Sequence, residues 1–332
     1  MSVKNIEIAR ALGLSKATVS LALAGKPGVN EKTRERILAC RDELEKEKKE
    51  GAPAPLRTIL ALVVNHGKNA LYDPEMDLFS GVLSAMEQEC TKRNYLFHLA
   101  YLNASENMQE TILAECNQEM VHGVIVLGTE INRNDLAFFQ RITKPLVVYD
   151  SNLLGDSYSS ICIDNARAVR LACEYLWNKG CRRIRYAATS KDIYNFSARR
   201  DAYIFYMVEH GSPVEKKDLM PLGKSIAEIT ESLREFLTLR WDRKEALILE
   251  NYQVAIAALA AARKTGIKIP DELKVVGIDK LPAYLPGESS LPQVVVHHEE
   301  RAVLAVDLLA VEIERKASSM KSRVLSIPYL RG

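Results

Sequence analysis

A short polar segment near the amino terminus has the residue types that contact DNA. Lys16, Ala17, Thr18 and Ser20 fall within five consecutive positions. Hydroxyl groups bond phosphate oxygens, a lysine reaches the acceptor atoms of guanine, and an alanine methyl contacts the methyl group of thymine. A helix that begins with these residues has the composition of one that enters the major groove. The same spacing also fits an ordinary solvated helix face, so the surrounding elements must decide.

Two short helices joined by a glycine turn would position this segment. Capping preferences predict a helix over residues 6–12 that begins after Asn5, and a second helix that begins after Ser15 and runs to about Ala24. Gly13 permits the turn between them, and its small size would let the two helices cross closely. Apolar residues recur so that each helix buries one face. They are Ile8, Ala9, Leu12, Leu14, Val19 and Leu23. Asn30 is predicted to cap a third helix.

Charge is distributed unevenly along the chain. The formal net charge of the 332 residues is +2. Residues 1–41 contain eight lysines or arginines and three glutamates, so this segment carries +5 and the remainder carries −3. A basic head on a mildly acidic body favours a nucleic-acid contact by the head and a separate function for the body.

Composition argues against several other classes of protein. The chain is 47% hydrophobic and 27% charged, which is typical of a globular protein, and its length predicts two or three domains. Its six cysteines are scattered without a C-x-x-C pair, which favours free thiols over disulfides or a metal site. The first residues lack the apolar core of a signal peptide, and no run reaches the roughly 18 apolar residues of a membrane span. We therefore expect a cytoplasmic protein with no membrane contact, metal or cofactor.

The stretch IEIARALGLSKATVSLALAGKPGVNEKTRERI resembles the helix-turn-helix headpiece of the LacI/GalR family of transcription regulators. The resemblance is carried by the run A-x-x-x-G-L-S-x-x-T-V-S and by the following V-x-x-x-T-R. It implies that Lys16 and Ala17 face base edges. It also implies a set of contacts to the phosphate backbone, made by Thr18, Ser20, Asn30, Thr33 and Arg34. Ser15, at the start of the same helix, belongs to the candidate DNA-binding set.

Two residues depart from the family pattern. Leu21 stands where many members have a base-reading arginine, and Ala24 stands where asparagine is usual. A leucine cannot make a bidentate contact to guanine. We therefore expect the operator preference to differ from that of arginine-bearing members by about 1–3 kcal/mol at that base. Leu21 remains in the candidate DNA-binding set.

A tether is expected between head and body. The charged run ELEKEKKE is followed by Gly51, Pro53 and Pro55, which cannot continue a helix, so residues 1–49 are assigned to the headpiece and 50–57 to a linker. Family members usually carry a Y-x-P-N-x-x-A-R-x-L hinge here, which folds on operator DNA. That motif is absent from this sequence, and Leu56 is its one apolar candidate for a minor-groove wedge.

From residue 58 onward, apolar runs alternate with helical stretches. The runs are TILALVVN, YLFHLAYL, GVIVLG, PLVVYD and SICID, then RIRYAAT, EALILE, KVVGID and PQVVVH. This alternation predicts parallel β-α-β units with helices on both faces, arranged as two doubly wound parallel sheets. The expected fold class is α/β, with a small all-α headpiece and a two-lobed body. A ligand would bind between the lobes at the carboxyl ends of the strands.

The body resembles the periplasmic-binding-protein-like sensor of the same family. The resemblance is clearest in IDNARAVRLACEYLWNKGCRRI, RRDAYIFYMVEHG and TGIKIPDELKVVGID. It implies that the chain crosses between lobes three times, near residues 163, 294 and 323. Lobe one would comprise about 58–163 and 295–322, and lobe two about 164–294 and 323–332.

The resemblance also supplies candidate effector contacts. Arg199 aligns with an effector-contacting arginine in R-x-x-G-F, although Ala202 replaces the glycine here. Asp279, after VVGI, aligns with a carboxylate that accepts hydrogen bonds from the ligand. Phe79 aligns with an aromatic residue near the ligand-facing loop of lobe one. Asn65, at the end of the first apolar run of the body, is also in the candidate set.

One departure affects the identity of the effector. Tyr252, preceded by Asn251, occupies a position that is commonly aspartate in the family. The change removes one carboxylate acceptor for a hexose. Tyr194 and Asn195, together with Tyr252, can supply stacking and hydrogen bonds to a polar ligand instead. Each of the three is about as well explained by packing or by surface exposure.

Other functional classes fit the sequence less well. LGKSIAEI contains the G-K-S triplet of a phosphate loop, but Asp218 occupies the position of the required first glycine. Neither G-x-S-x-G nor H-E-x-x-H is present. Asp164 and Asp279 are explained by helix capping and ligand contact, so no catalytic residue is assigned. His297 and His298 are expected to be solvated or structural rather than metal ligands. A transport-type solute-binding protein would need export.

We therefore expect a DNA-binding transcription regulator, in the first place a repressor, and not an enzyme. A homodimer would place two recognition helices in successive major grooves of near-palindromic double-stranded operator DNA. A small polar effector, in the first place a sugar or a derivative, would change operator affinity by closing the lobes. A cytosolic sensor without a strong operator, or an enzyme on the same scaffold, is the alternative.

Overall fold

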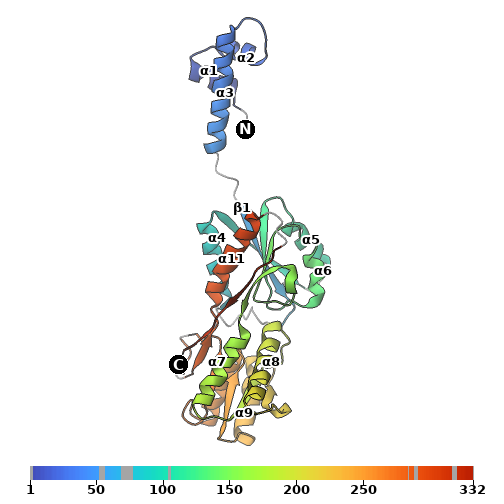
Figure 1. Ribbon diagram of the computed structural model, residues 1–332, viewed down its shortest axis with the longest axis vertical. Helices are drawn as coiled ribbons and strands as arrows, with labels where there is room; N and C mark the ends of the chain where they lie inside the picture. The colour runs from blue at the N-terminus through green and yellow to red at the C-terminus, as the bar shows by residue number, and fades with distance from the viewer. Residues whose placement is uncertain are drawn as a thin grey trace. The chain divides into compact units, whose positions relative to one another are not determined.

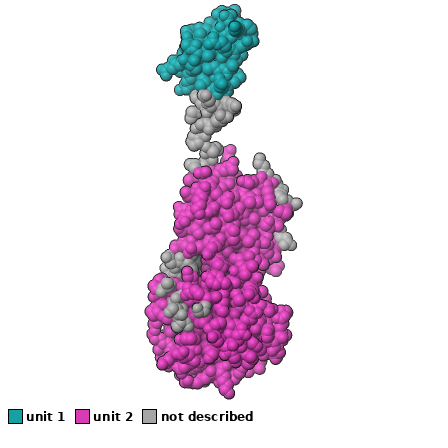
Figure 2. All heavy atoms as spheres, turned by 60° about the vertical axis from the view of Figure 1, so that its left-hand side comes forward, with its two compact units in different colours: residues 1–56 teal, residues 57–332 magenta. Residues whose placement is uncertain are grey.

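The computed structural model describes residues 3–51, 57–68, 78–103, 106–282, 284–287, 291–315 and 320–331. The chain forms two compact units, residues 1–56 and residues 57–332, which are coloured separately in Figure 2. Three sequence predictions concern residues outside the described ranges. These are the helix-breaking prolines Pro53 and Pro55 and the candidate wedge Leu56.

The first unit is a three-helix domain. Its helices are α1 (Asn5–Leu12), α2 (Lys16–Leu23) and α3 (Glu31–Gly51). Ile8, Val19 and Ile37, one from each helix, are fully buried at the centre of its small core. All six apolar residues predicted to face inward belong to this core, either buried or partly buried. The charged run before Gly51 is helical, so α3 extends two residues beyond the predicted end of the headpiece.

Two local predictions for the first unit are wrong. Lys4, not Asn5, precedes the first helical residue, and the Lys4 N–H donates to Glu7 Oε2 at 2.7 Å, so the glutamate caps this end. Gly13 has a φ of 64°, in the left-handed region that favours glycine. A Cβ added at Gly13 would have no atom within 4 Å. This glycine therefore serves the backbone turn and not a close crossing of helices.

Lobe one of the second unit is a six-stranded parallel sheet in the order β11-β5-β4-β3-β1-β2. Its strands are β1 (Arg57–Asn65), β2 (Tyr95–Asn103), β3 (Val121–Leu127), β4 (Leu146–Tyr149), β5 (Ser159–Ile163) and β11 (Arg323–Ser326). Helices α4 (Leu78–Lys92) and α11 (His298–Glu314) pack side by side on one face, and α5 (Glu106–Cys116) and α6 (Leu136–Phe139) cover the other (Figure 1).

Lobe two repeats this plan with the order β12-β10-β9-β8-β6-β7, in which β12 is antiparallel to β10. Its strands are β6 (Arg183–Ala188), β7 (Leu219–Pro221), β8 (Glu245–Leu249), β9 (Val275–Ile278), β10 (Gln293–Val295) and β12 (Tyr329–Arg331). Helices α7 (Asn165–Asn178) and α8 (Tyr194–Glu209) cover one face, and α9 (Ile226–Leu239) and α10 (Tyr252–Thr265) cover the other. Short 3-10 helices are η1 (Arg133–Asp135), η2 (Gly155–Ser157) and η3 (Lys216–Asp218).

The chain crosses between the lobes after β5, after β10 and after β11. The predicted third crossing, near residue 323, is therefore misplaced. Residues 323–326 form β11, which pairs with β5 in lobe one, and the crossing lies between Ser326 and Tyr329. A short edge strand with only partial burial gives no apolar run, so its sequence does not indicate which sheet it joins.

All nine apolar runs of the body form strands, and the two doubly wound sheets agree with the predicted fold class. The strands that the sequence did not predict are the short β7, β11 and β12. All six cysteines are free thiols, as expected. Within the described ranges, no helix is both long and apolar enough to span a membrane.

Candidate functional site

The exposed side of α2 carries the candidate DNA-binding residues of the first unit. Ser15 is the N-cap, and its Oγ accepts a hydrogen bond from Thr18 N at 3.1 Å. Ser15 Oγ also lies 2.8 Å from Thr18 Oγ1, so the two hydroxyls fix each other. Lys16, Ala17 and Ser20 are exposed. The start of α2 therefore presents a cation, a methyl group and hydroxyls to solvent, together with the positive end of the helix dipole.

The remaining candidates lie at the far end of α2 and at the start of α3. The Leu21 side chain is 36% exposed, although it is a large apolar residue. Asn30 caps α3, and its Oδ1 accepts from Thr33 N at 2.7 Å. Arg34 Nη2 donates to the Lys26 carbonyl oxygen at 2.8 Å, which braces the loop between α2 and α3. The capping prediction for Asn30 is confirmed, whereas the phosphate contacts of Asn30, Thr33 and Arg34 stay predictions.

The second unit has a cleft between its lobes at the carboxyl ends of the strands. The residues around it come from both lobes. They are Val82, Thr129, Asp150, Ile163, Ile193, Asn195, Phe196, Arg199, Asn251, Tyr252, Asp279 and His298. The cavity they enclose has a volume of about 40 Å³, well below the roughly 300–1,000 Å³ of drug-sized ligand sites. In this conformation side chains of the two lobes fill most of the cleft.

Five of the eight candidate effector residues line this cleft. They are Asn195, Arg199, Asn251, Tyr252 and Asp279. The other three lie elsewhere. Phe79 is buried in the lobe-one core among α4 and α11 residues. Asn65 closes the turn after β1, where its Oδ1 accepts from Gly67 N at 2.8 Å. Tyr194 is the first residue of α8 and is half-buried outside the lining.

Sequence reasoning missed three polar residues of lobe one that line the cleft, which are Thr129, Asp150 and His298. Asp150 directly follows the buried strand β4, just as Asp279 follows β9, so an acid at a strand end was the available signal. His298 was set aside as structural, yet it lines the cavity from the first position of α11. Arg301, one turn later, is fully buried and contacts Asp150 and His298. Arginine in a helix gives no sequence signal for such burial.

The polar side chains of the cleft form a closed ring across the two lobes. Its members, in order, are Asp150, Arg301, His298, Asp279, Arg199, Asn165 and Asn195. On the lobe-one side, Arg301 Nη1 donates to Asp150 Oδ1 at 2.6 Å, and Arg301 Nη2 donates to His298 Nδ1 at 2.9 Å. His298 Nε2 then faces Asp279 Oδ1 of lobe two at 3.4 Å.

The remaining contacts of the ring are made by residues of lobe two, and the last of them closes the ring at Asp150. Arg199 Nη2 lies 3.6 Å from Asp279 Oδ1, and Arg199 Nε donates to Asn165 Oδ1 at 2.9 Å. Asn165 Nδ2 donates to Asn195 Oδ1 at 2.8 Å. Asn195 Nδ2 donates at 3.0 Å to the carbonyl oxygen of Asp150 in lobe one. The ring joins the lobes at two points, and the contacts at Asp279 are its longest.

The histidine in the ring is held in one tautomer. A guanidinium only donates hydrogen bonds, so the contact from Arg301 requires His298 Nδ1 to be an acceptor. Neutral His298 then carries its proton on Nε2, which faces Asp279. His298 Nε2 and Asp279 Oδ1 are both buried, and among the described residues the polar contact between them is a long one of 3.4 Å. The cleft therefore offers one donor and one acceptor to a hydroxyl-bearing ligand.

Both ring aspartates have unusual backbone conformations. Asp150 has a φ of 69° and Asp279 a φ of 83°, in the left-handed region that costs a non-glycine residue about 1–3 kcal/mol. These conformations place both carboxylates in the cleft beyond the strand ends. Such strain persists where the surrounding structure enforces it, and it is frequent at binding sites.

Burial and charge shift the pKa of one cleft acid, Asp279, and of an acid behind the cleft, Glu250, in opposite directions. Burial raises the pKa of Asp279, but Arg199 and His298 outweigh it and lower this pKa to about 2. Glu250, behind the cleft, is fully buried, and desolvation raises its pKa even though Arg200 and Thr189 oppose the shift. Asp279 is therefore a firm hydrogen-bond acceptor at neutral pH.

Comparison with known proteins yields two family matches. Residues 6–45 match the model of bacterial regulatory proteins of the lacI family. Residues 173–331 match the model of a periplasmic binding protein-like domain. The two matches fall in the first and second structural units, respectively.

Among curated proteins, the chain is similar to the transcriptional regulator GalS of Salmonella typhimurium, with 26% identity over 282 residues that cover 83% of this chain and 80% of the relative. It is 24% identical over 280 residues to the transcriptional repressor PurR of Yersinia pestis, and these residues cover 83% of this chain and 80% of the relative.

Solved structures share the fold. The transcriptional regulator CelR in complex with cellobiose superposes with a TM-score of 0.70 at 22% identity, covering 98% of this chain and 97% of that one. The Lac repressor dimer bound to operator and the anti-inducer ONPF superposes with a TM-score of 0.64 at 18% identity, covering 100% of this chain and 98% of that one.

Proposed function

The chain belongs to the LacI family of bacterial regulatory proteins, and from that premise we propose that it is a repressor whose operator affinity is controlled by a neutral polyhydroxylated ligand bound in the interlobe cleft. The relatives named above are transcription regulators, and DNA binding follows from the family. The ligand class, the reading residues and the dimer are parts of the proposal.

The recognition surface is the start of α2. Lys16 and Ala17 face the base edges of the major groove, while Thr18 and Ser20 position the helix on phosphates. A twofold dimer applies this surface to two half-sites, so the operator is near-palindromic double-stranded DNA. The Lac repressor, which has the same fold, is described as a dimer bound to operator. This role places the protein in the cytoplasm, with the DNA.

The charge balance of the cleft is the observation that supports a neutral ligand. Arg199 and Arg301 each lie beside an aspartate, Asp279 and Asp150 respectively, so the described ring contains two cations and two anions. A phosphate or carboxylate ligand would need an unpaired cation there, whereas hydroxyl groups need only the available donor and acceptor. CelR, which has the same fold, binds cellobiose, a neutral sugar. A sugar or sugar derivative without an ionised group is therefore the proposed effector.

Coupling to DNA follows from the ring. A ligand that bonds to Asp279 and His298 replaces the 3.4 Å contact by which these two residues join the lobes. The equilibrium between open and closed lobes then depends on the ligand, by an amount equal to its differential affinity for the two states. The three crossing segments transmit the change in lobe angle through the second unit.

A ligand screen with a linked DNA assay tests the proposal. Neutral sugars, sugar phosphates, nucleosides and amino acids are added to the full-length protein, and thermal unfolding is measured. A true ligand at a hundredfold excess over Kd stabilises the protein by about 2.7 kcal/mol, and it should also change the affinity for a selected operator. The Asp279→Ala variant is the control and should lose both effects. Stabilisation by an anionic compound alone, retained in Asp279→Ala, would contradict the proposed ligand class.

A further inference from the structure

A second, strongly basic concavity lies in lobe two at the amino ends of the strands, whereas the cleft lies at their carboxyl ends. It has a volume of about 380 Å³, within the range of small-ligand sites. It is formed where the chain enters β6, β8 and β9, which are the amino ends of three neighbouring strands. We name it the basic groove. Its cationic residues are Lys179, Arg182, Arg183, Arg243, Lys244 and Lys274.

The cations of the basic groove outnumber its acids. Glu245 and Glu272 are the acidic residues in the lining. Arg183 pairs with Glu245 at 2.8 Å, and Arg243 pairs with Glu272 at 2.7 Å. Within the part of the chain that the structure describes, no carboxylate lies within 4.0 Å of the charged nitrogens of the four remaining cations. These are Lys179, Arg182, Lys244 and Lys274.

Two guanidinium groups of the groove are held in fixed positions. Arg182 Nη1 donates to the carbonyl oxygens of Trp177 at 2.8 Å and Cys181 at 3.2 Å, and its guanidinium lies 4.4 Å from the centre of the Trp177 ring. Arg183 is held between two carboxylates, Glu245 at 2.8 Å and Asp242 at 2.5 Å. Rigid guanidinium forks lose little entropy when they bind an oxyanion, and they match the geometry of phosphate oxygens.

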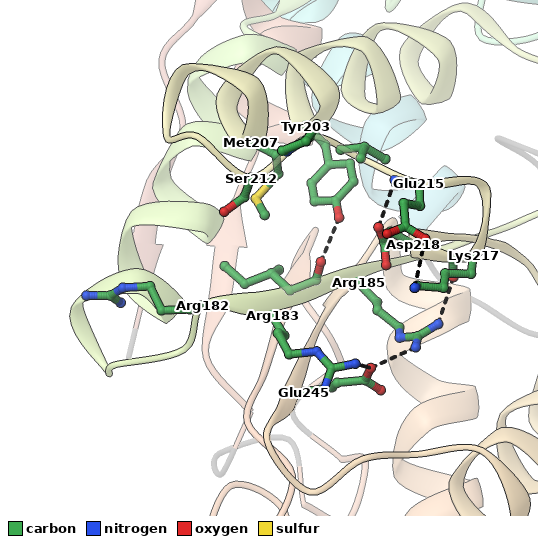
Figure 3. Close-up of a pocket in the computed structure, with 13 residues that line it drawn as sticks. Arg182, Arg183, Arg185, Tyr203, Met207, Ser212, Glu215, Lys217, Asp218 and Glu245 are labelled. Carbon is green, nitrogen blue, oxygen red and sulfur yellow. Dashed lines mark hydrogen bonds and ion pairs between the residues drawn. The ribbon is translucent and has the colours of Figure 1, made fainter.

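The neighbouring pocket on the other side of Arg183 provides a contrast. Figure 3 shows it between β6 and α8, with Arg183 and Arg185 both turned toward Glu245 and joined to it by dashed lines. Lys217 also pairs with Glu215 at 2.7 Å, so three of the four cations that line this pocket have a carboxylate partner. By formal charge that pocket therefore carries an excess of one positive charge, whereas the basic groove carries an excess of four.

We propose that the basic groove binds a compact, multiply charged anion of the polyphosphate class. Its volume fits a small ligand, whereas duplex DNA is recognised through a stripe of cations along many phosphates. The fixed guanidinium of Arg182 and three lysine ammoniums without a carboxylate partner, all within one concavity, favour several closely spaced phosphate groups over a single carboxylate. This site goes beyond the proposed repressor function, since it involves neither the cleft nor the headpiece.

The two tryptophans of the sequence report on this site. Trp177 lies beneath Arg182, and the Trp241 ring centre lies 5.8 Å from the Arg243 guanidinium. The experiment titrates the full-length protein with tripolyphosphate at constant ionic strength and records tryptophan fluorescence and calorimetric heat. We expect saturable binding with one site per chain and a fluorescence change of the same midpoint. The Kd should rise with salt concentration.

Variants separate this site from the basic headpiece. Lys244→Gln combined with Lys274→Gln should weaken tripolyphosphate binding at least tenfold, since both lysines are exposed and their replacement keeps the fold. Lys224→Gln is the matched control, because Lys224 is an exposed lysine of lobe two outside the groove, and it should leave the Kd unchanged. Binding that persists in the double variant would overturn the proposal. So would equal competition by sulfate, or binding of a polyglutamate peptide in place of tripolyphosphate.

Discussion

Asp150 and Asp279 hold matching positions in the two lobes, each immediately after a central strand and each in a left-handed backbone conformation. Each carboxylate lies beside a buried arginine, Arg301 at 2.6 Å and Arg199 at 3.6 Å, respectively. His298 links the two halves. The duplicated sheet plan of the lobes explains this symmetry, because both strand ends open onto the same cleft.

Replacement of Arg199 should destabilise the second unit as well as weaken ligand binding. Arg199 is 2% exposed, and Arg199→Ala leaves Asp279, Asn165 and the Glu250 carbonyl oxygen without its donors. Breaking such a buried pair costs about 3–5 kcal/mol. Urea unfolding of the two proteins measures the difference.

The control for this experiment is an arginine on the surface of the same lobe. Arg167 is about half-exposed and lies 4.0 Å from Glu174, so Arg167→Ala should cost less than about 1 kcal/mol. Equal losses in the two variants would show that the buried contacts of Arg199 do not stabilise the second unit.

The Asp279 carboxylate should make stability depend on acid pH. Its pKa is lowered in the folded protein to about 2, so its contribution is present above the pKa of the unfolded chain and is lost as the pH falls toward 2. Between pH 6 and pH 3, the free-energy difference between the native protein and Asp279→Asn should shrink by about 1 kcal/mol. Unfolding curves at several pH values measure it, and a difference independent of pH would contradict the ion-pair assignment.

Lys16 and Thr18 should differ in what they contribute to DNA binding. Lys16→Ala removes a base contact, so it should weaken the preferred operator by about 1–3 kcal/mol and relax the preference at one base pair. Thr18→Ala removes a phosphate contact and should weaken all duplexes alike. Affinities for a panel of single-base operator variants separate the two effects. A uniform loss in Lys16→Ala would mean that another residue reads the base.

Leu21 offers a gain-of-contact test. Its side chain is exposed on the outer face of α2, so Leu21→Arg should fold with unchanged stability. An arginine there can make a bidentate contact to guanine, which should shift the preference at one position by about 1–3 kcal/mol. Duplex selection with the native protein and the variant should give sites that differ at one symmetric pair of positions. Identical selected sites would place Leu21 outside the interface.

Much of the fold followed from the sequence because its elements are strongly patterned. The buried parallel strands are continuous apolar runs, and Ser15 and Asn30 are direct helix caps. The short edge strands lacked such runs, and β11 was therefore placed in the wrong lobe. The G-K-S triplet proved to be a helix start, with Ser225 as the N-cap of α9 and Glu228 completing the capping box.

The cleft was only partly predictable, since its polar ring depends on tertiary packing. Arg199 and Asp279 were found through a family resemblance, and both belong to the ring. Arg301 and His298 were not identified as cleft residues from the sequence, because they lie on α11, which returns to lobe one after the second crossing. Phe79 was expected at the ligand but packs in the core. An aromatic residue at such a position can contact a ligand or pack in the core, and the sequence does not distinguish the two roles.

Unbiased selection of DNA by the purified full-length protein tests the central claim most directly. A random duplex library is bound at moderate ionic strength, and the enriched sequences are read out for the native protein and for Lys16→Ala. The account predicts a near-palindromic site with two equivalent half-sites, whose enrichment falls sharply in the variant. Absence of any preferred sequence, or a site recovered equally well by Lys16→Ala, would contradict it.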